Sequence, residues 1–371
     1  MKSKTGKNKL VAVHLLNDYS GSPLILSNVL KTAVKNGYRT HLCSCFSKQK
    51  GFLSDLEGVI NHSQSYKWSP NKWLTLTYYL WNQLKLFLRL IIVLKKNDLV
   101  YINSILPFGA AFAGKVCNCH VIYHVHEVSI KPPTLKKFLL WMVEWCADEC
   151  IYVSNFLQEQ TPIATPHQVV YNTLSDDFMA KSNHTKATEK FDSSKPFTVM
   201  MACSMKKYKG VFQFLEVAKQ LPDISFQLIL NAKKEEIDLF FLEKEIPKNV
   251  KLFEANPNLH PQYFQSDVVM NLSFPDEWIE TFGMTILEAM QYGKPVIVPP
   301  IGGVTELVEN NWNGFRIDSR QLEEIVKALH LLSTDKMLYQ KFSEASLQKA
   351  AEFSNENFEE KIKGLLYRFI P

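Results

Sequence analysis

The sequence predicts an α/β protein with two doubly wound parallel sheets, and three observations lead to that fold class. Short apolar runs of strand length alternate with helical segments along the whole chain. A polar stretch, Ala180 to Pro196, is nearly free of large apolar residues and divides these runs into two groups. At 371 residues the chain is long for one core and suits two domains.

The strand-like runs set the expected domain boundaries. In the first half they are Leu10 to Leu16, Thr40 to Phe46, Asp98 to Ser104, His120 to Glu127, Glu149 to Ser154 and Gln168 to Asn172. In the second half they are Phe197 to Ser204, Ser225 to Leu230, Val250 to Glu254, Val268 to Ser273, Pro295 to Pro299 and Gly314 to Ile317. We therefore expect a first domain at 1–180, a linker at 181–196, a second domain at 197–354 and a final helix within 355–371.

The first strand is followed by Asp18-Tyr-Ser-Gly-Ser-Pro, which leads into an apolar-periodic run from Leu24. Gly21 and Ser22 are thus expected in a turn that opens a helix. Such a turn can approach a phosphate or a sugar, and a plain connecting turn is the alternative interpretation.

The segment from Trp73 to Leu94 is apolar and long enough to span a bilayer. However, Asn82, Lys85, Arg89 and Lys96 recur at helical spacing and predict one polar stripe on an apolar helix. Two interpretations remain: a buried helix of the first domain, or a surface helix lying on anionic lipid. The basic aromatic run from Lys131 to Trp145 allows the same two interpretations.

The fourth strand run ends in Tyr123-His-Val-His-Glu127, where strand alternation puts His124 and His126 on one face. His126 lies nearer the end of the strand, where ligand-binding side chains are often found. It is a candidate to hydrogen-bond a substrate or to support charge in a transition state, and a structural histidine is the alternative.

Composition and charge narrow the class of protein. With 46% hydrophobic and 21% charged residues the chain is globular, and a net charge of +5 does not by itself indicate a nucleic-acid binder. The seven cysteines show no zinc-ligand spacing and fall mostly in apolar runs, so we expect reduced core thiols and a cytoplasmic location. The basic start precedes only a short apolar run and is a poor signal peptide.

Two segments of the second half carry candidate binding residues. Cys203 to Gly210 closes a strand and opens a helix, with Lys209 directly before the glycine. From Phe274 to Val308, a strand, a loop, a Glu280-Thr-Phe-Gly turn, a helix that carries Glu288 and a second strand follow one another. Free amides at such a helix start attract a diphosphate, and a carboxylate further along can accept two hydrogen bonds from vicinal hydroxyls.

With this context the Glu280 to Glu288 segment resembles the E-x7-E donor-site signature of family 4 glycosyltransferases, the retaining enzymes of GT-B fold. Lys209-Gly210 is similar to the Lys-Gly of the family's G-R-L-x-x-x-K-G pattern, but the arginine of that pattern falls on Ser204. Serine offers one hydroxyl where arginine offers a fork of donors, so Lys206 or Lys207 is a candidate substitute.

The resemblance implies two Rossmann-like domains that face a central cleft, with the last helix packed back on the first domain. It implies His126 and Glu280 as the residues that contact the transferred sugar. It also implies a donor-binding set that holds the ribose through Glu288 and the diphosphate through the lysine and the turn amides. That set is Gly21, Ser22, Ser204, Lys209, Thr281, Phe282, Gly283, Met284, Thr285 and Glu288.

The expected activity is that of a bacterial glycan-assembly enzyme, a retaining hexosyltransferase. It would move a hexosyl group from a nucleotide diphosphate sugar to a glycan or lipid-linked saccharide. The nucleotide sugar is a substrate, and no Asp-x-Asp motif sits at a strand end, so we expect neither a cofactor nor a metal. The alternatives are a nucleotide-sugar isomerase of the same fold and a non-catalytic subunit that binds a partner enzyme or the membrane. The expected partners are the donor, the acceptor and, through the Trp73 helix, the anionic inner face of the membrane, and not nucleic acid.

Overall fold

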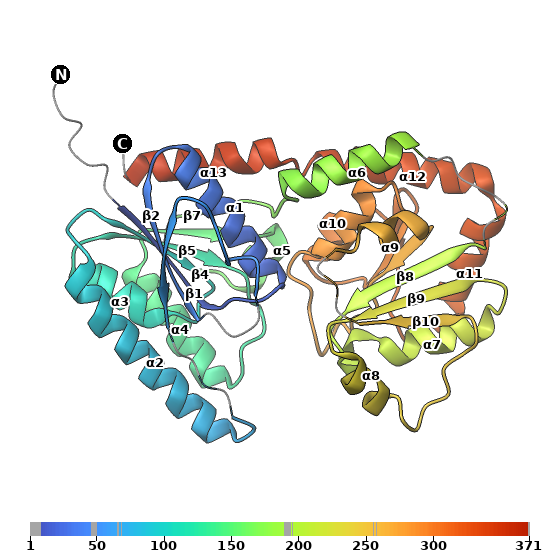
Figure 1. Ribbon diagram of the computed structural model, residues 1–371, viewed down its shortest axis with the longest axis horizontal. Helices are drawn as coiled ribbons and strands as arrows, with labels where there is room; N and C mark the ends of the chain where they lie inside the picture. Colours follow the sequence, from blue (N-terminus) through green and yellow to red (C-terminus); the bar gives the residue numbers. More distant parts are fainter. Residues whose placement is uncertain are drawn as a thin grey trace. The chain divides into compact units, whose positions relative to one another are not determined.

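The computed structural model describes residues 9–369 except 46–49, 65, 66, 68, 189–193, 195, 255 and 257, and it describes only the backbone of 185–188. The chain divides into two compact units (Figure 1). The first comprises Met1–Asn172 with Glu356–Pro371, and the second comprises Thr173–Asn355. The basic start at 1–8, Phe46 and much of the predicted linker lie outside the described residues.

The first unit contains a parallel sheet of seven strands in the order β3-β2-β1-β4-β5-β6-β7. The order runs outward in both directions from β1, as in a doubly wound sheet. Its strands are β1 Lys9–Leu16, β2 Arg39–Cys45, β3 Val59–Ser63, β4 Leu99–Asn103, β5 His120–Val125, β6 Glu149–Tyr152 and β7 His167–Val169. Strand β3, at the edge, was not predicted, because its sequence Val-Ile-Asn-His-Ser is largely polar and exposed.

Helices cover both faces of this sheet. Figure 1 shows α2, α3 and α4 on one face, and α1 and α13 on the other. The helices are α1 Gly21–Lys35, α2 Lys72–Val93, α3 Phe108–Val116, α4 Pro133–Cys146, α5 Asn155–Gln160 and α13 Asn355–Phe369. Helix α13 buries Phe358, Ile362, Leu365 and Leu366, and Arg368 forms an ion pair with Glu149 of β6 at 2.5 Å. The last helix is therefore part of the first unit.

The second unit contains a parallel sheet of six strands in the order β10-β9-β8-β11-β12-β13. Its strands are β8 Thr198–Cys203, β9 Ser225–Leu230, β10 Val250–Phe253, β11 Val268–Met270, β12 Val296–Val298 and β13 Gly314–Arg316. Its helices are α6 Asp176–Thr188, α7 Val211–Gln220, α8 Lys234–Phe240, α9 His260–Gln265, α10 Met284–Gln291, α11 Leu322–Thr334 and α12 Lys336–Ala351, with short 3-10 turns η1 Lys207–Lys209 and η2 Gly303–Glu306. The prediction of two doubly wound α/β sheets is confirmed.

Helix α6 occupies part of the segment that the sequence predicts as a linker. It begins with Asp176 and Asp177, whose charges suit a helix amino terminus. Ser182 is fully buried and accepts a hydrogen bond from the Gln291 side chain at 3.2 Å. Polar residues at 176–184 thus form a packed helix, because their partners lie on other elements of the second unit.

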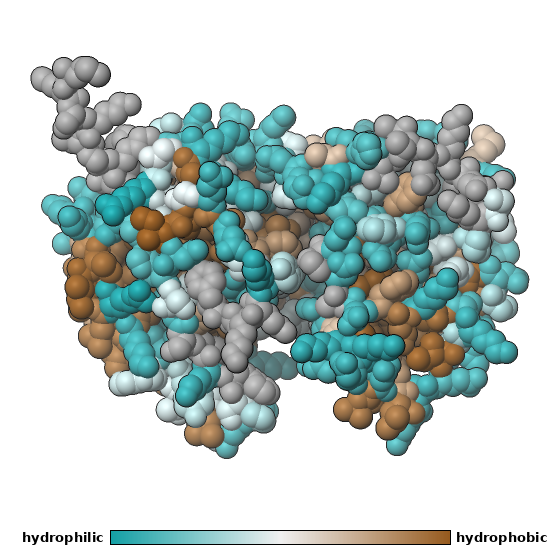
Figure 2. Space-filling model, in the orientation of Figure 1, coloured by the Kyte–Doolittle hydropathy of each residue, from teal (hydrophilic) through white to brown (hydrophobic). Residues whose placement is uncertain are grey.

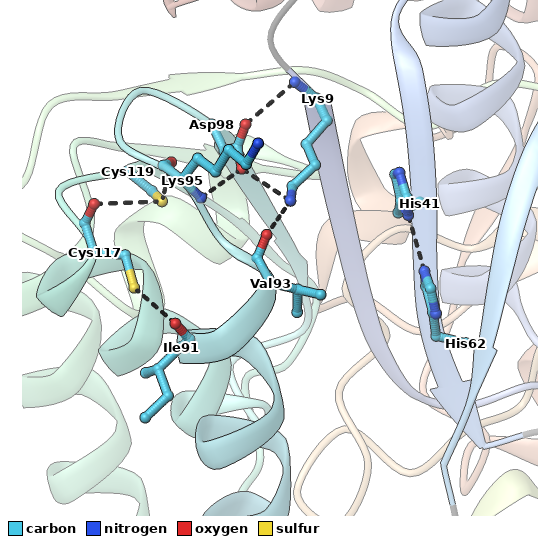
Figure 3. A network of polar contacts seen from close by, with 9 residues as sticks. All are labelled: Lys9, His41, His62, Ile91, Val93, Lys95, Asp98, Cys117 and Cys119. Carbon is cyan, nitrogen blue, oxygen red and sulfur yellow. Dashed lines mark hydrogen bonds and ion pairs between the residues drawn. The ribbon is translucent and has the colours of Figure 1, made fainter.

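Asp98 fixes the corner between α2 and β4 at the amino-terminal edge of the first sheet (Figure 3). Its carboxylate pairs with the Lys9 ammonium at 3.2 Å and accepts the Lys95 amide at 2.8 Å. The Cys119 thiol donates to the Lys95 carbonyl at 3.2 Å. All seven cysteines are free thiols, and burial raises the pKa of Cys43 and Cys45 to about 11. Such thiols are poor nucleophiles.

Helix α2 differs from the predicted polar stripe. Asn82 is buried with 4% exposure, whereas Lys85 and Arg89 are exposed, and Lys96 lies beyond the end of the helix at Val93. The buried face carries Asn82 beside Gln83, and large apolar residues lie on the exposed face. Among the described residues no helix is long and apolar enough to cross a bilayer.

Candidate functional site

In the second unit, Lys209 and Glu280 form an ion pair that is largely shielded from solvent. Their side chains are 12% and 18% exposed. The Lys209 ammonium also lies 4.7 Å from the centre of the Trp278 ring. The Tyr208 ring stacks on the same Trp278 ring, with 5.4 Å between the ring centres. The Ser273 hydroxyl donates to a Glu280 carboxylate oxygen at 3.0 Å. These contacts hold both side chains, and with them the positive charge of Lys209, in a defined position.

Burial raises the pKa of the Glu280 carboxyl, but the charge of Lys209 and hydrogen bonds from Lys209, Asn271 and Ser273 together hold that pKa below its usual value. Glu280 is consequently ionised at neutral pH. An ionised carboxylate beside a lysine can accept hydrogen bonds from hydroxyl groups of a ligand.

A tight turn after β8 positions Lys209. The turn begins at Ser204, whose carbonyl accepts the Lys206 amide at 2.8 Å, and η1 follows. Gly210 then adopts φ +74°, and a Cβ there would lie 2.3 Å from the Leu272 carbonyl oxygen. Lys206 and Lys207 are exposed, so among these three lysines only Lys209 is directed into the structure by the glycine.

Helix α10 starts immediately after the loop that carries Glu280. Gly283 is its N-cap at φ +106°, and a Cβ there would lie 2.9 Å from the Val304 side chain. Phe282 is buried and packs edge-to-face on Phe353, which anchors the turn. The first amides of the helix, at Met284 and Thr285, have no carbonyl four residues earlier within the helix, and the macrodipole adds positive potential there.

Two adjacent glycines, Gly302 and Gly303, contact the backbone of Glu280. Gly303 donates its amide to the Glu280 carbonyl at 2.7 Å. Gly302 has φ +121°, and a Cβ there would approach the same carbonyl to 2.7 Å. After these glycines the chain forms the short turn η2, Gly303–Glu306.

Glu288 lies on α10 as its fifth residue, a little more than one turn from the start. The buried Tyr263 hydroxyl donates to one of the two carboxylate oxygens at 2.5 Å. Burial raises the pKa of Glu288 to about 7, although the Tyr263 hydrogen bond opposes the rise. Glu288 therefore changes charge near neutral pH.

In the first unit, Asn103 joins polar residues at the carboxyl ends of β1, β4 and β5. Its side-chain oxygen pairs with the His126 ring at 2.9 Å, and its amide donates to the Ser22 carbonyl at 3.1 Å. The Asn103 carbonyl contacts the His14 ring at 2.8 Å. Gly21 and Ser22 are the first two residues of α1, so the structure brings Ser22 and His126 to one polar cluster.

The rings of His124 and His126 lie 4.3 Å apart between centres, on the same face as the alternation predicts. Burial lowers the pKa of His126 well below its usual value, and the neighbouring His124 and His14 add to this effect. The His126 ring is therefore neutral at physiological pH, which suits a hydrogen-bonding role better than a charged one.

Sequence reasoning missed Tyr263, Trp278 and Asn103. Asn103 had a usable signal, because it ends a predicted strand next to the strand that ends near His126. Tyr263 and Trp278 had none, since their contacts to Glu288 and Lys209 join residues that are far apart in the sequence or lie in irregular loops.

A family model and a named relative both indicate a glycosyltransferase. Residues 183–349 match the family model described as glycosyl transferases group 1. An uncharacterized glycosyltransferase of Haemophilus influenzae is 28% identical over 180 residues, which cover 46% of this chain and 48% of that protein. The chain thus aligns with about half the length of that relative. A 41.2 kDa protein in the cps region of Klebsiella pneumoniae is 26% identical over 273 residues, covering 66% of this chain and 72% of that protein.

Among solved structures, Anabaena Alr3699/HepE in complex with UDP and glucose superposes with a TM-score of 0.76 at 18% identity, over 97% of this chain and 99% of that one. At that identity the match shows the fold alone. The fold of this chain is that of the GT-B glycosyltransferases. The segment that matches the group 1 glycosyl transferase model, residues 183–349, supplies Lys209, Glu280 and Glu288.

Proposed function

We propose that the chain is a retaining, metal-independent glycosyltransferase of family 4 that transfers a hexosyl group from a nucleotide diphosphate sugar to a glycan or lipid-linked acceptor. The observation that carries the proposal is the shielded Lys209–Glu280 pair placed next to the start of α10 in a group 1 domain. It is supported by a structural relative that was solved with UDP-glucose and by a relative named poly(glycerol-phosphate) alpha-glucosyltransferase.

In this proposal the diphosphate binds where positive potential is fixed in advance. Lys209 supplies a full charge, and the first amides of α10 supply oriented donors without reorganisation. As the bond to the sugar breaks, negative charge accumulates on the leaving diphosphate. Stabilising that charge is then the largest contribution to catalysis. Ser204, at the start of the lysine turn, adds one hydroxyl where the family has an arginine.

Two carboxylates, Glu288 and Glu280, contact the ribose and the transferred sugar of the nucleotide sugar in this proposal. Glu288 accepts hydrogen bonds from the vicinal ribose hydroxyls through the carboxylate oxygen that does not bind Tyr263. Glu280, ionised and held by Lys209 and Ser273, contacts the transferred sugar. In the first unit, hydrogen bonding is the role that we propose for the neutral ring of His126, which lies in one polar cluster with Ser22 at the start of α1.

Product analysis tests this function. A thermal-shift screen with UDP-, GDP- and ADP-sugars first identifies the donor, because a ligand of the native state raises Tm by mass action. With that donor and a candidate acceptor, we expect nucleotide diphosphate and glycosylated product in equal amounts, with retained anomeric configuration and no loss in EDTA. An altered nucleotide sugar without product would indicate the isomerase. Donor binding without any turnover or donor hydrolysis would indicate the non-catalytic subunit.

The raised pKa of Glu288 predicts a pH-dependent donor affinity. The carboxylate accepts two hydroxyls, whereas the protonated form does not, so affinity should rise from pH 6 to 8 through the pKa of about 7. Glu288→Gln should lower affinity roughly tenfold or more at pH 8 and abolish the pH dependence. Tyr263→Phe removes a contact that lowers this pKa and should move the midpoint upward. Calorimetric titration at several pH values measures the donor affinity of the wild type and of both variants. A wild-type affinity that does not change with pH would show that Glu288 does not bind the donor.

A stability measurement separates this role from a structural one. Because the folded-state pKa lies above the usual 4.5, the folded chain holds a proton that the unfolded chain releases between these values. Glu288 therefore lowers stability as pH rises from about 4.5 to 7. Glu288→Gln should leave Tm equal or higher at pH 8 while donor affinity falls.

A further inference from the structure

A chain of aromatic side chains, some partly buried and some about half exposed, runs across α2, α3 and α4 of the first unit. Phe87 of α2 stacks on Phe112 of α3 at 4.8 Å, and Phe112 lies 5.5 Å from Trp145 of α4. Trp145 stacks in turn on Trp141 at 5.7 Å, and both tryptophans are about half exposed. Figure 2 shows apolar residues gathered where α2 and α3 lie. We name this surface the aromatic face.

Helix α2 extends the aromatic face with aliphatic residues. Leu80, Leu84 and Leu88 recur every four residues and are each almost half exposed. This spacing places them along one side of the helix, next to Phe87 and therefore next to α3. Trp73 at the start of the helix is 79% exposed, and Ile92 near its end is 84% exposed. A surface of this extent is unusual in the absence of a binding partner.

Basic residues border the aromatic face. Helix α2 contains Lys72, Lys85 and Arg89 and no acidic residue. Lys85 and Arg89 follow Leu84 and Leu88 by one position, which turns them about 100° around the helix from the leucines. The Lys85 ammonium lies 5.4 Å from the Trp81 ring, so charge and aromatic surface meet at this border.

Beside this border lies a pocket of about 250 Å³ lined by Ser63, Gln64, Asn82, Lys85, Leu86 and Arg89. Arg89 donates to the Ser63 carbonyl at 2.9 Å, and a second nitrogen lies 3.5 Å from the His62 ring. His62 itself contacts His41 at 2.8 Å, a pair that Figure 3 shows on adjacent strands. A guanidinium has five N–H donors, so these contacts orient Arg89 and leave donors for an anion. The pocket lining contains two cations and no carboxylate.

We propose that the first unit binds the surface of an anionic lipid bilayer, with the aromatic face in the interfacial layer and a headgroup phosphate in the Lys85–Arg89 pocket. Tryptophan and lysine on one amphipathic surface are typical of interfacial binding. The basic border complements anionic lipid, and bidentate contacts from arginine suit a phosphate. This binding needs no turnover and is independent of the proposed activity.

The charge distribution favours a bilayer over a second copy of the chain. In a symmetric dimer through the aromatic face, the basic border would have to meet another part of the same patch, which is mainly apolar. Helix α2 offers no acidic residue to pair with it. Anionic lipid meets both the apolar surface and the positive border at once.

Vesicle flotation with the full chain tests the proposal. We expect the chain to float with vesicles of phosphatidylglycerol and phosphatidylcholine and not with phosphatidylcholine alone. Salt should weaken the binding, since the attraction is screened within about 10 Å at 0.1 M. Millimolar glycerol phosphate should not release the chain, because it lacks the bilayer. No flotation with anionic vesicles, or equal flotation with neutral ones, overturns the proposal.

Matched variants locate the site. Lys85→Gln with Arg89→Gln should weaken binding about twenty-five-fold, at roughly fivefold for each charge, whereas the exposed Lys31→Gln of α1 should change it much less. Trp81→Ser with Leu88→Ser should abolish flotation, while Leu242→Ser, 77% exposed in the second unit, should not. Circular dichroism checks that each variant is folded. If the double variant is unfolded because Arg89 is needed for stability, Lys85→Gln is tested alone. Equal binding by all variants contradicts the proposal, as does a dimer in light scattering that Trp81→Ser dissociates.

Discussion

Lys209→Ala is expected to reduce turnover about a hundredfold or more and to weaken donor binding much less. The ammonium meets negative charge that grows on the diphosphate during the reaction, so its removal costs more in the transition state than in the ground state. Removal of one preorganised donor of this kind typically costs about 10²–10³ in kcat. Steady-state kinetics and donor titration measure the two effects separately.

The buried partner of Lys209 requires a structural control. Lys209→Ala leaves the Glu280 carboxylate shielded and unpaired, which can cost about 3 to 5 kcal/mol of stability. Lys209→Met combined with Glu280→Gln removes both charges and should restore Tm without restoring turnover. Lys206→Ala and Lys207→Ala, both at exposed sites, should leave kcat within a few-fold of wild type. If Lys206→Ala is the most damaging of the three, the assignment of the diphosphate lysine is wrong.

Gly210→Ala is expected to destabilise the second unit by about 3 kcal/mol or more. The residue has φ +74°, which disfavours a side chain, and the new methyl would lie 2.3 Å from the Leu272 carbonyl oxygen. The backbone turn that holds Lys209 must then shift. A fall in Tm of roughly 10 °C is expected by circular dichroism, and donor affinity should fall with it.

The chain offers a matched control for this glycine. Gly364 lies in α13, and a Cβ added there meets no atom within 4 Å. Gly364→Ala should therefore be neutral or stabilising by about 0.5–1 kcal/mol, because alanine loses less entropy in a helix. A Gly210→Ala variant with wild-type Tm would show that the Lys-Gly turn is adaptable rather than fixed.

The sheets were predictable because buried parallel strands read as short apolar runs. β1, β5 and β9 match their predicted runs closely, and all three are mostly buried. Edge strand β3 was missed, since one side of it is not covered by a neighbouring strand and its residues can be polar. The polar stripe predicted for helix α2 is divided, because Asn82 is buried whereas Lys85 and Arg89 are exposed. Periodicity locates a polar stripe but does not say whether that stripe faces water or buried polar partners such as those of Gln83, which accepts the Gly109 amide at 3.0 Å.

The candidate site could be predicted only where local sequence fixes local geometry. Gly283 before α10 and Gly210 after the lysine turn both adopt positive φ, and the resemblance to a known signature drew attention to both. The pairing of Lys209 with Glu280 joins positions 71 residues apart, and that of Tyr263 with Glu288 joins positions 25 apart. Contacts of this kind depend on the order of strands in the sheet. The roles proposed for these residues remain predictions until the variants are measured.

The place of α13 in the chain has a consequence for biosynthesis. The first unit needs this helix, whose Ile362 and Leu366 are fully buried and whose Arg368 pairs with Glu149. On the ribosome, however, the whole second unit is made between Asn172 and Glu356. At ordinary translation rates the apolar groove for α13 stays uncovered for roughly ten to forty seconds. The nascent first unit is then a natural client for chaperones, and the second unit is expected to fold before the first is complete.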